Sequence, residues 1–159
     1  MAKPLHLSEK QRLAAELYCL SFFDTSFRSR FITLVTAVEA LLNPVMRPAK
    51  VQSLIDNVKA SLRGLETDDA TRESMRGSLD YMKYESIGQA GRSLADSLLG
   101  DREYSGMKPG RFFNRCYGLG SEIVYRGAPS DSTVDLLQES NALQAFVGDL
   151  LIASFGASP

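Results

Sequence analysis

The stretch that decides the fold runs from Phe112 to Gly127 and reads FFNRCYGLGSEIVYRG. Two helix-breaking pairs enclose it, Pro109-Gly110 before and Ala128-Pro129 after. Between them apolar residues recur at helical spacing, so we expect a helix over about 111–125 with Gly127 as its C-terminal cap. Aromatic, arginine and glycine residues are denser here than a plain apolar face requires. The stretch is therefore also a candidate site.

The other helices are predicted from amphipathic spacing and from capping residues. The first predicted helix runs over about 9–22, is opened by Ser8 and has Leu13, Leu17 and Leu20 on its apolar face. The second follows Ser26, is ended by Asn43-Pro44 and has an apolar face of Phe31, Leu34, Val35, Val38, Leu41 and Leu42.

Three further helical segments are predicted. One follows Pro48, is closed by Gly64 and has an apolar face of Val51, Leu54, Ile55, Val58 and Leu62. A long pattern then runs from Met75 to Leu98 with a kink or break at Gly88 and Gly91, and a last helix is opened by Ser132 and runs to about 155.

These segments predict the fold class. No stretch shows strand periodicity, and short connections favour antiparallel neighbours, so we expect an all-α, up-and-down bundle of about five to six helices. A chain of 159 residues is long enough for one well-buried domain. We therefore expect a single domain over 1–159 with its core at about 9–155.

Composition narrows the classes of function. Hydrophobic residues make up 44% and charged residues 23% of the chain, and no apolar run reaches the roughly 18 to 20 residues of a membrane span. The first ten residues lack the apolar core of a secretory signal, so we expect a cytoplasmic protein that does not enter the membrane. The net charge of −1 does not indicate strong non-specific binding to phosphates.

Few side chains are available for metal or triad chemistry. His6 is the only histidine, which removes most metal sites and most histidine-dependent triads. No Glu-x-x-His pair is present for a carboxylate-bridged metal centre, so we expect no metal and no cofactor. Cys19 and Cys116 lie among apolar residues, and we expect both to be buried as small hydrophobic side chains.

Three segments together resemble the HEPN superfamily, in particular its ApeA-like domains. They are Leu17-Tyr18, the segment Arg30–Leu42 (RFITLVTAVEALL) and the segment Tyr117–Gly127 (YGLGSEIVYRG). The resemblance covers roughly residues 12 to 150. It implies an all-α bundle that commonly dimerises, in a family with many metal-independent endoribonucleases of defence and toxin–antitoxin systems.

The chain departs from the family at the catalytic positions. The family motif carries an arginine followed four to six residues later by a histidine; here the arginine position is Gly120 and the histidine position is Tyr125. Cleavage needs a group that titrates near neutral pH and a cation for the transition state. A tyrosine with a pKa near 10 is a poor base, and glycine carries no charge. The resemblance thus predicts a degenerate site, a pseudoenzyme.

The remaining candidates for binding are side chains near this site. They are Arg111, Arg115, Tyr117, Ser121, Tyr125, Arg126 and Glu39. Arg115 or Arg126 could replace the lost cation, and all three arginines could share a helical face; solvated or glutamate-paired arginines are the alternative reading. We further expect Glu39, which matches a residue typical of the family's early helix, to pair with one of them.

Three functions are open from the sequence. The first is a non-catalytic HEPN-like domain that acts as a homodimer or binds a protein partner, with residual affinity for RNA. The second is a HEPN endoribonuclease that uses displaced residues. The third is a pure adaptor without contact to nucleic acid, for a partner such as a nucleotidyltransferase.

Overall fold

The computed structural model describes residues 7–156, and His6 lies outside the described residues. Within them the chain is helical, as predicted, with two isolated β-bridges and no strand. Short 3-10 turns follow α1 and α3. The helices are α1 (Glu9–Leu20), α2 (Phe27–Leu41), α3 (Ala49–Ser61), α4 (Asp69–Tyr81), α5 (Ile87–Leu99), α6 (Pro109–Arg126) and α7 (Leu136–Gly156).

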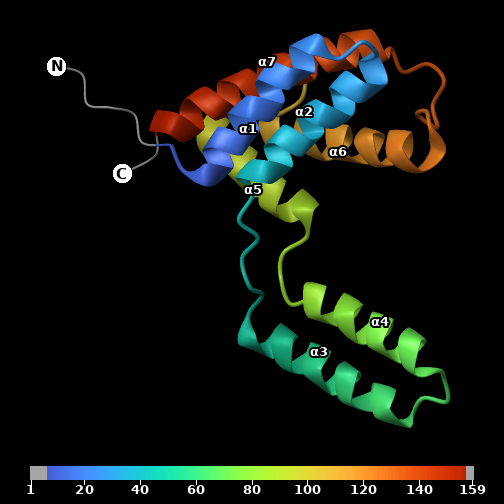
Figure 1. The fold of residues 1–159 in the computed structure, drawn as a ribbon. Coiled ribbons are helices and arrows are strands. Elements are labelled where there is room, and N and C mark those ends of the chain that lie inside the picture. The colour runs from blue at the N-terminus through green and yellow to red at the C-terminus, as the bar shows by residue number, and fades with distance from the viewer. Residues whose placement is uncertain (1–6, 157–159) are drawn as a thin grey trace. The chain divides into compact units, whose positions relative to one another are not determined.

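The chain forms two compact units where the sequence predicted one continuous bundle (Figure 1). The first unit joins residues 1–42 to residues 91–159 and contains α1, α2, α6 and α7. The second comprises Asn43–Ala90 and contains the hairpin of α3 and α4. The boundary between them falls inside α5.

In the first unit both α2 and α7 contact the other three helices of the set α1, α2, α6 and α7, and the contacts of α2 are the more extensive. The hydroxyl of Ser26 caps the start of α2 by accepting from the backbone N–H of Ser29 at 3.1 Å. The predicted apolar face of this helix is confirmed, since all six of its residues are buried. The rest of the core is apolar and comes mainly from α6 and α7: Phe112, Phe113, Cys116, Ile123, Leu143, Phe146, Val147, Leu150 and Leu151.

The long helix α6 begins two residues before the predicted start, with Pro109 in its first turn. It ends as predicted at Gly127, whose φ of 80° is left-handed and favours glycine. Arg28 donates to the carbonyl of Gly127 at 2.9 Å. The start of α2 is thereby tied to the end of α6, so the two helices run antiparallel.

The apolar face predicted for α1 is wrong. Leu13 and Leu20 are exposed, and the buried residues of α1 are Gln11 and Ala14. Gln11 tolerates burial because its side chain accepts from Ser8 N–H in the predicted capping box and donates to the carbonyl of Ser154 at 2.8 Å. The small side chain of Ala14 lets α1 lie close to its neighbours.

The break in the long predicted helix is real, but it precedes both glycines. Helix α4 ends at Tyr81 and α5 begins at Ile87, so Gly88 and Gly91 lie inside α5. Between the helices the backbone pairs with an extended segment instead: Arg47 N–H donates to Lys83 O at 2.8 Å and Glu85 N–H to Val45 O at 2.9 Å. These bonds replace the helical ones and end the helix.

Two further predictions need correction. The last helix begins at Leu136, because the carboxylate of Asp135 accepts from the N–H groups of Leu137 and Gln138 at 2.9 and 3.3 Å; Ser132 therefore does not cap it. Cys116 is buried as predicted, but Cys19 is exposed. No helix among residues 7–156 has both the length and the apolar character that crossing a bilayer requires.

Gly91 of α5 allows α6 to pack closely against α5. A Cβ at position 91 would lie 1.9 Å from Cε1 of Phe113, whose ring is fully buried. By contrast, a Cβ at Gly118, exposed on α6, would meet nothing within 4 Å. Gly91 is thus required for packing, whereas Gly118 only weakens its helix.

This contrast predicts opposite effects of the same substitution. Gly91→Ala should lower the free energy of unfolding by about 1–3 kcal/mol through overpacking, and Gly118→Ala should raise it by about 0.5–1 kcal/mol through helix propensity. Urea denaturation followed by circular dichroism measures both. Equal effects of the two substitutions would contradict this account of the α5–α6 contact.

Candidate functional site

A groove between α2 and α6 collects the residues that the sequence singled out. Its cavity volume is about 170 Å³. It is lined by Ile32, Val35, Thr36 and Glu39 of α2 and by Tyr117, Gly120, Ser121, Val124 and Tyr125 of α6. Gly120 and Tyr125, the two positions that the HEPN resemblance assigns to the catalytic pair, therefore line one groove with Glu39, which comes from a segment about 80 residues away in sequence.

Gly120 lines this groove and packs against Val35 of α2. It is buried, and a Cβ at this position would lie 3.3 Å from Cγ2 of Val35 and 3.6 Å from Cγ1. Even a methyl group would press on the β-branched side chain opposite, which has little rotamer freedom in a helix. The residue at the family's arginine position thus serves the contact between α6 and α2.

Tyr125 stands at the rim of the groove and is 87% exposed. Its neighbour Val124 is also exposed, whereas Tyr117 is half-buried. Burial raises the pKa of Tyr117, and the nearby Glu39 and Tyr125 raise it further. Tyr117 is therefore protonated at neutral pH and is not a base.

Glu39 is half-buried in the groove and has no compensating cation. Its carboxylate makes no hydrogen bond or ion pair within residues 7–156. Burial alone raises its pKa above the usual range of a glutamate. The expected pairing of Glu39 with an arginine is wrong.

The three candidate arginines lie elsewhere. Arg115 pairs with Glu139 of α7, Arg126 donates to Ser130 Oγ at 2.5 Å, and Arg111 is exposed with no partner in the described part of the chain. None of the three lines the groove. The reason is helical geometry: positions 111, 115 and 126 project from other faces of α6 than positions 117, 121 and 124.

The groove can therefore accept hydrogen bonds and attract cations. Among the described residues that line it are one carboxylate, two phenols and two hydroxyls, with neither an imidazole nor a cation. Such a set offers no cation to the negative charge that develops on a phosphate during cleavage. Residues 7–156 also contain no group of three or more metal-binding side chains.

The sequence did not predict the ion pair between Arg115 of α6 and the buried Glu139 of α7. Glu139 is buried near Cys116, pairs with Arg115 through Oε1 and leaves Oε2 without a partner among the described residues. Burial, with Glu139 nearby, raises the pKa of the Cys116 thiol, which stays protonated. The signal was weak because a Glu in the first turn of a helix is common at the surface.

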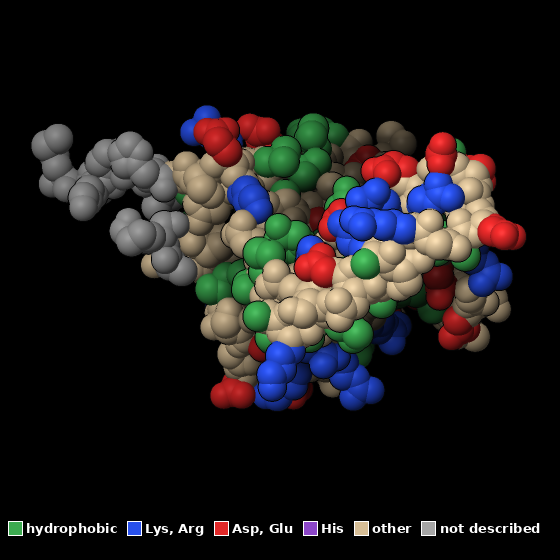
Figure 2. All heavy atoms as spheres, turned by 90° about the horizontal axis from the view of Figure 1, so that it is seen from below, with side chains coloured by type: hydrophobic (Ala, Val, Ile, Leu, Met, Phe, Trp, Pro, Cys, Tyr) green, Lys and Arg blue, Asp and Glu red, His purple; other side chains and the backbone are tan. Residues whose placement is uncertain are grey.

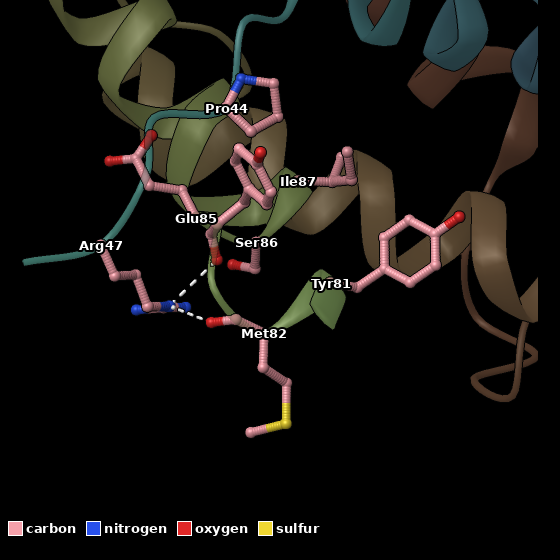
Figure 3. A pocket seen from close by; sticks show the side chains of 8 residues that line it. Pro44, Arg47, Tyr81, Met82, Glu85, Ser86 and Ile87 are labelled. Carbon is pink, nitrogen blue, oxygen red and sulfur yellow. Dashed lines mark hydrogen bonds between the residues drawn. The ribbon is translucent and has the colours of Figure 1, made fainter. Parts of the chain in front are cut away.

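A larger cavity in the second unit was also missed. Its volume is about 620 Å³, and Pro44, Arg47, Tyr81, Met82, Tyr84, Glu85, Ser86 and Ile87 line it (Figure 3). Arg47 Nε donates to the carbonyls of Met82 and Tyr84, at 3.0 Å each, as the dashed lines in Figure 3 show. The guanidinium thus holds the turn between α4 and α5, and the sequence did not reveal this because the turn was predicted to be helical.

Comparison of the chain with models of protein families, with curated proteins and with solved structures finds no match. The HEPN resemblance accordingly stays a prediction that rests on the residues quoted for it.

The uncompensated carboxylate predicts that Glu39→Gln stabilises the protein at pH 7. The pKa of Glu39 is higher in the folded than in the unfolded chain, so its charge costs stability at high pH. That cost disappears as pH falls through the raised pKa toward the unfolded value of about 4.3. Because Glu39 is only partly buried, solvent screening keeps the gain below about 1 kcal/mol.

Thermal denaturation at pH 7 and pH 4 measures this gain, which should shrink at the lower pH. Glu16→Gln is the matched control, since Glu16 is exposed on α1 and makes no ion pair within residues 7–156. A Glu39→Gln variant that is less stable than wild type at pH 7 would mean that the carboxylate has a partner.

Proposed function

We propose that this chain is a HEPN-like helical domain without catalytic activity, which acts through association with a second copy or with another protein. The observation that carries the proposal is the groove itself. The positions that would hold the catalytic arginine and histidine are Gly120, packed on Val35, and Tyr125, exposed at the rim. The groove thus contains both positions that the resemblance assigns to catalysis, but neither an arginine nor a histidine occupies them.

The nearby arginines do not restore the missing cation. A displaced catalytic arginine would have to reach the groove, and Arg115 is instead committed to the buried carboxylate of Glu139. Releasing it would leave that carboxylate buried without a partner, which typically costs several kcal/mol. This cost favours the non-catalytic function over a nuclease with displaced residues.

Exposed apolar side chains favour association. Val124 and Tyr125 project from the rim of the groove. In the second unit α4 buries no residue, and the predicted apolar face of α3 leaves Val51, Leu54 and Val58 exposed. The ion pairs Lys59–Asp80, at 2.5 Å, and Lys83–Asp56, at 2.6 Å, hold the two helices of this hairpin together. An amphipathic hairpin with an uncovered apolar face is typical of an interaction surface.

The distribution of charge favours a protein over RNA as the partner. Figure 2 shows basic and acidic side chains lying beside one another over the face drawn. The net charge is −1, and the groove contains a carboxylate and no cation among its described lining residues. Binding of RNA depends on clustered lysine and arginine side chains that neutralise phosphates.

A restored site provides the test. Wild-type protein with EDTA should leave structured RNA intact, and Gly120→Arg/Tyr125→His should cleave it at least about tenfold faster than wild type, since general acid–base catalysis alone contributes about 10²–10⁴-fold. The matched control is Gly118→Arg/Tyr125→His, which places the arginine on the exposed face of the same helix. Circular dichroism confirms that each variant is folded.

Two results would overturn the proposal. Metal-independent cleavage by the wild type that Tyr125→Phe or Arg115→Ala abolishes would make the protein an enzyme. A folded Gly120→Arg/Tyr125→His variant that cleaves no faster than its control would remove the support for a HEPN-like site in this groove.

A further inference from the structure

We propose that the groove between α2 and α6 binds a cationic side chain, a lysine or an arginine, which an associated protein inserts toward Glu39. This inference rests on the proposed function, because it names what the partner presents to the groove. Three features of the groove carry it: an unpaired carboxylate, walls that contain two tyrosine rings and no cation among the described lining residues, and a size that fits one side chain.

The first feature is the carboxylate of Glu39. It is half-buried, and no side chain within residues 7–156 donates to it or pairs with it. Half-buried carboxylates in folded proteins are normally paired, because removal from water disfavours the charge. A lysine or arginine from outside the chain would supply the missing partner through charge-assisted hydrogen bonds.

The second feature is the chemistry of the walls. The hydroxyl of Thr36 donates to the carbonyl of Ile32 at 2.9 Å, and that of Ser121 donates to the carbonyl of Tyr117 at 3.0 Å. Both hydroxyl protons are thus used within the helices, and the two oxygens are left as acceptors. Lysine and arginine carry only donors, so they match the carboxylate and these two oxygens, whereas no cation among the described lining residues would neutralise a phosphate.

The aromatic residues add a second attraction for a cation. Tyr117 and Tyr125 line the groove on either side of Ser121, one half-buried and one at the exposed rim. The face of a tyrosine ring attracts an ammonium or a guanidinium group. Val124 and Ile32, also in the lining, offer apolar surface to the aliphatic stem of such a side chain.

The third feature is size. The groove has a volume of about 170 Å³, which corresponds to about five or six water molecules at about 30 Å³ each. That space suits the end of one long side chain. Typical sites for whole small-molecule ligands are larger, at about 300–1,000 Å³.

The test compares butylguanidinium with butylurea, its neutral isostere. The backbone amide signals of Gly120 and Ser121 in 15N–1H spectra report binding to the groove. The dissociation constant of butylguanidinium should be at least about tenfold lower than that of butylurea, because charge-assisted hydrogen bonds are about twice as strong as neutral ones. In Glu39→Gln most of this preference should be lost, because only the attraction of the tyrosine rings remains, and in the matched control Glu16→Gln the full preference should persist.

Two further probes identify the source of the cation. The blocked residue N-acetyl-arginine methylamide should bind at least as tightly as butylguanidinium if the groove takes a side chain of a polypeptide. Spermidine that binds tenfold more tightly than both would assign the groove to a free polyamine and overturn the proposal. Equal binding of butylguanidinium and butylurea to the wild type, or a preference that is undiminished in Glu39→Gln, would also overturn it.

Failure here is distinguishable from failure of the proposed function. The titrations report on Glu39 and its surroundings, whereas the RNA assay reports on positions 120 and 125. A groove without preference for cations, in a protein that cleaves RNA only after Gly120→Arg/Tyr125→His, would remove this inference and leave the non-catalytic function in place.

Discussion

The close contact of α6 with α2 is the constraint on which the first unit depends. Helix α6 buries Phe112, Phe113, Cys116 and Ile123 in the core. Its close contacts with α5 and with α2 each depend on a position that has no Cβ. One is Gly91 of α5 under Phe113, and the other is Gly120 of α6 on Val35. Where packing is this close, one additional methyl group changes the stability of the fold. The same contact forms the groove, so the fold and the candidate site have one physical origin.

The residues of the groove lower the stability of the folded chain. Glu39 carries a half-buried charge that nothing in residues 7–156 compensates, and Val124 and Tyr125 expose apolar surface at its rim. Features of this kind lower stability in the isolated chain and are kept where they serve a function. By contrast, the buried carboxylate of Glu139 is paired with Arg115 through Oε1. The proposed function assigns the unpaired carboxylate of Glu39 to a partner.

The sequence predicted the parts of the fold that local signals control. The apolar face of α2, the caps at Ser8 and Ser26 and the left-handed Gly127 all follow from spacing and residue type, and all are confirmed. The buried face of α1 could not be predicted, because Gln11 is buried only through its bond to distant Ser154. The turn at 82–86 depends likewise on pairing with residues 45–47. In the site, the predicted pairing of Glu39 with an arginine failed, because Arg115 pairs with Glu139 of α7, and residue spacing within α6 does not reveal a partner on another helix.

The central claim is that position 120 serves the packing of two helices and not chemistry. A double-mutant cycle between Gly120→Ala and Val35→Ala, measured as free energies of unfolding in urea, tests it directly. The account predicts coupling of at least about 0.5 kcal/mol: Gly120→Ala should be less favourable in the wild type, where the new methyl presses on Val35, than in Val35→Ala, where helix propensity alone stabilises it. Strictly additive effects of the two substitutions would contradict it.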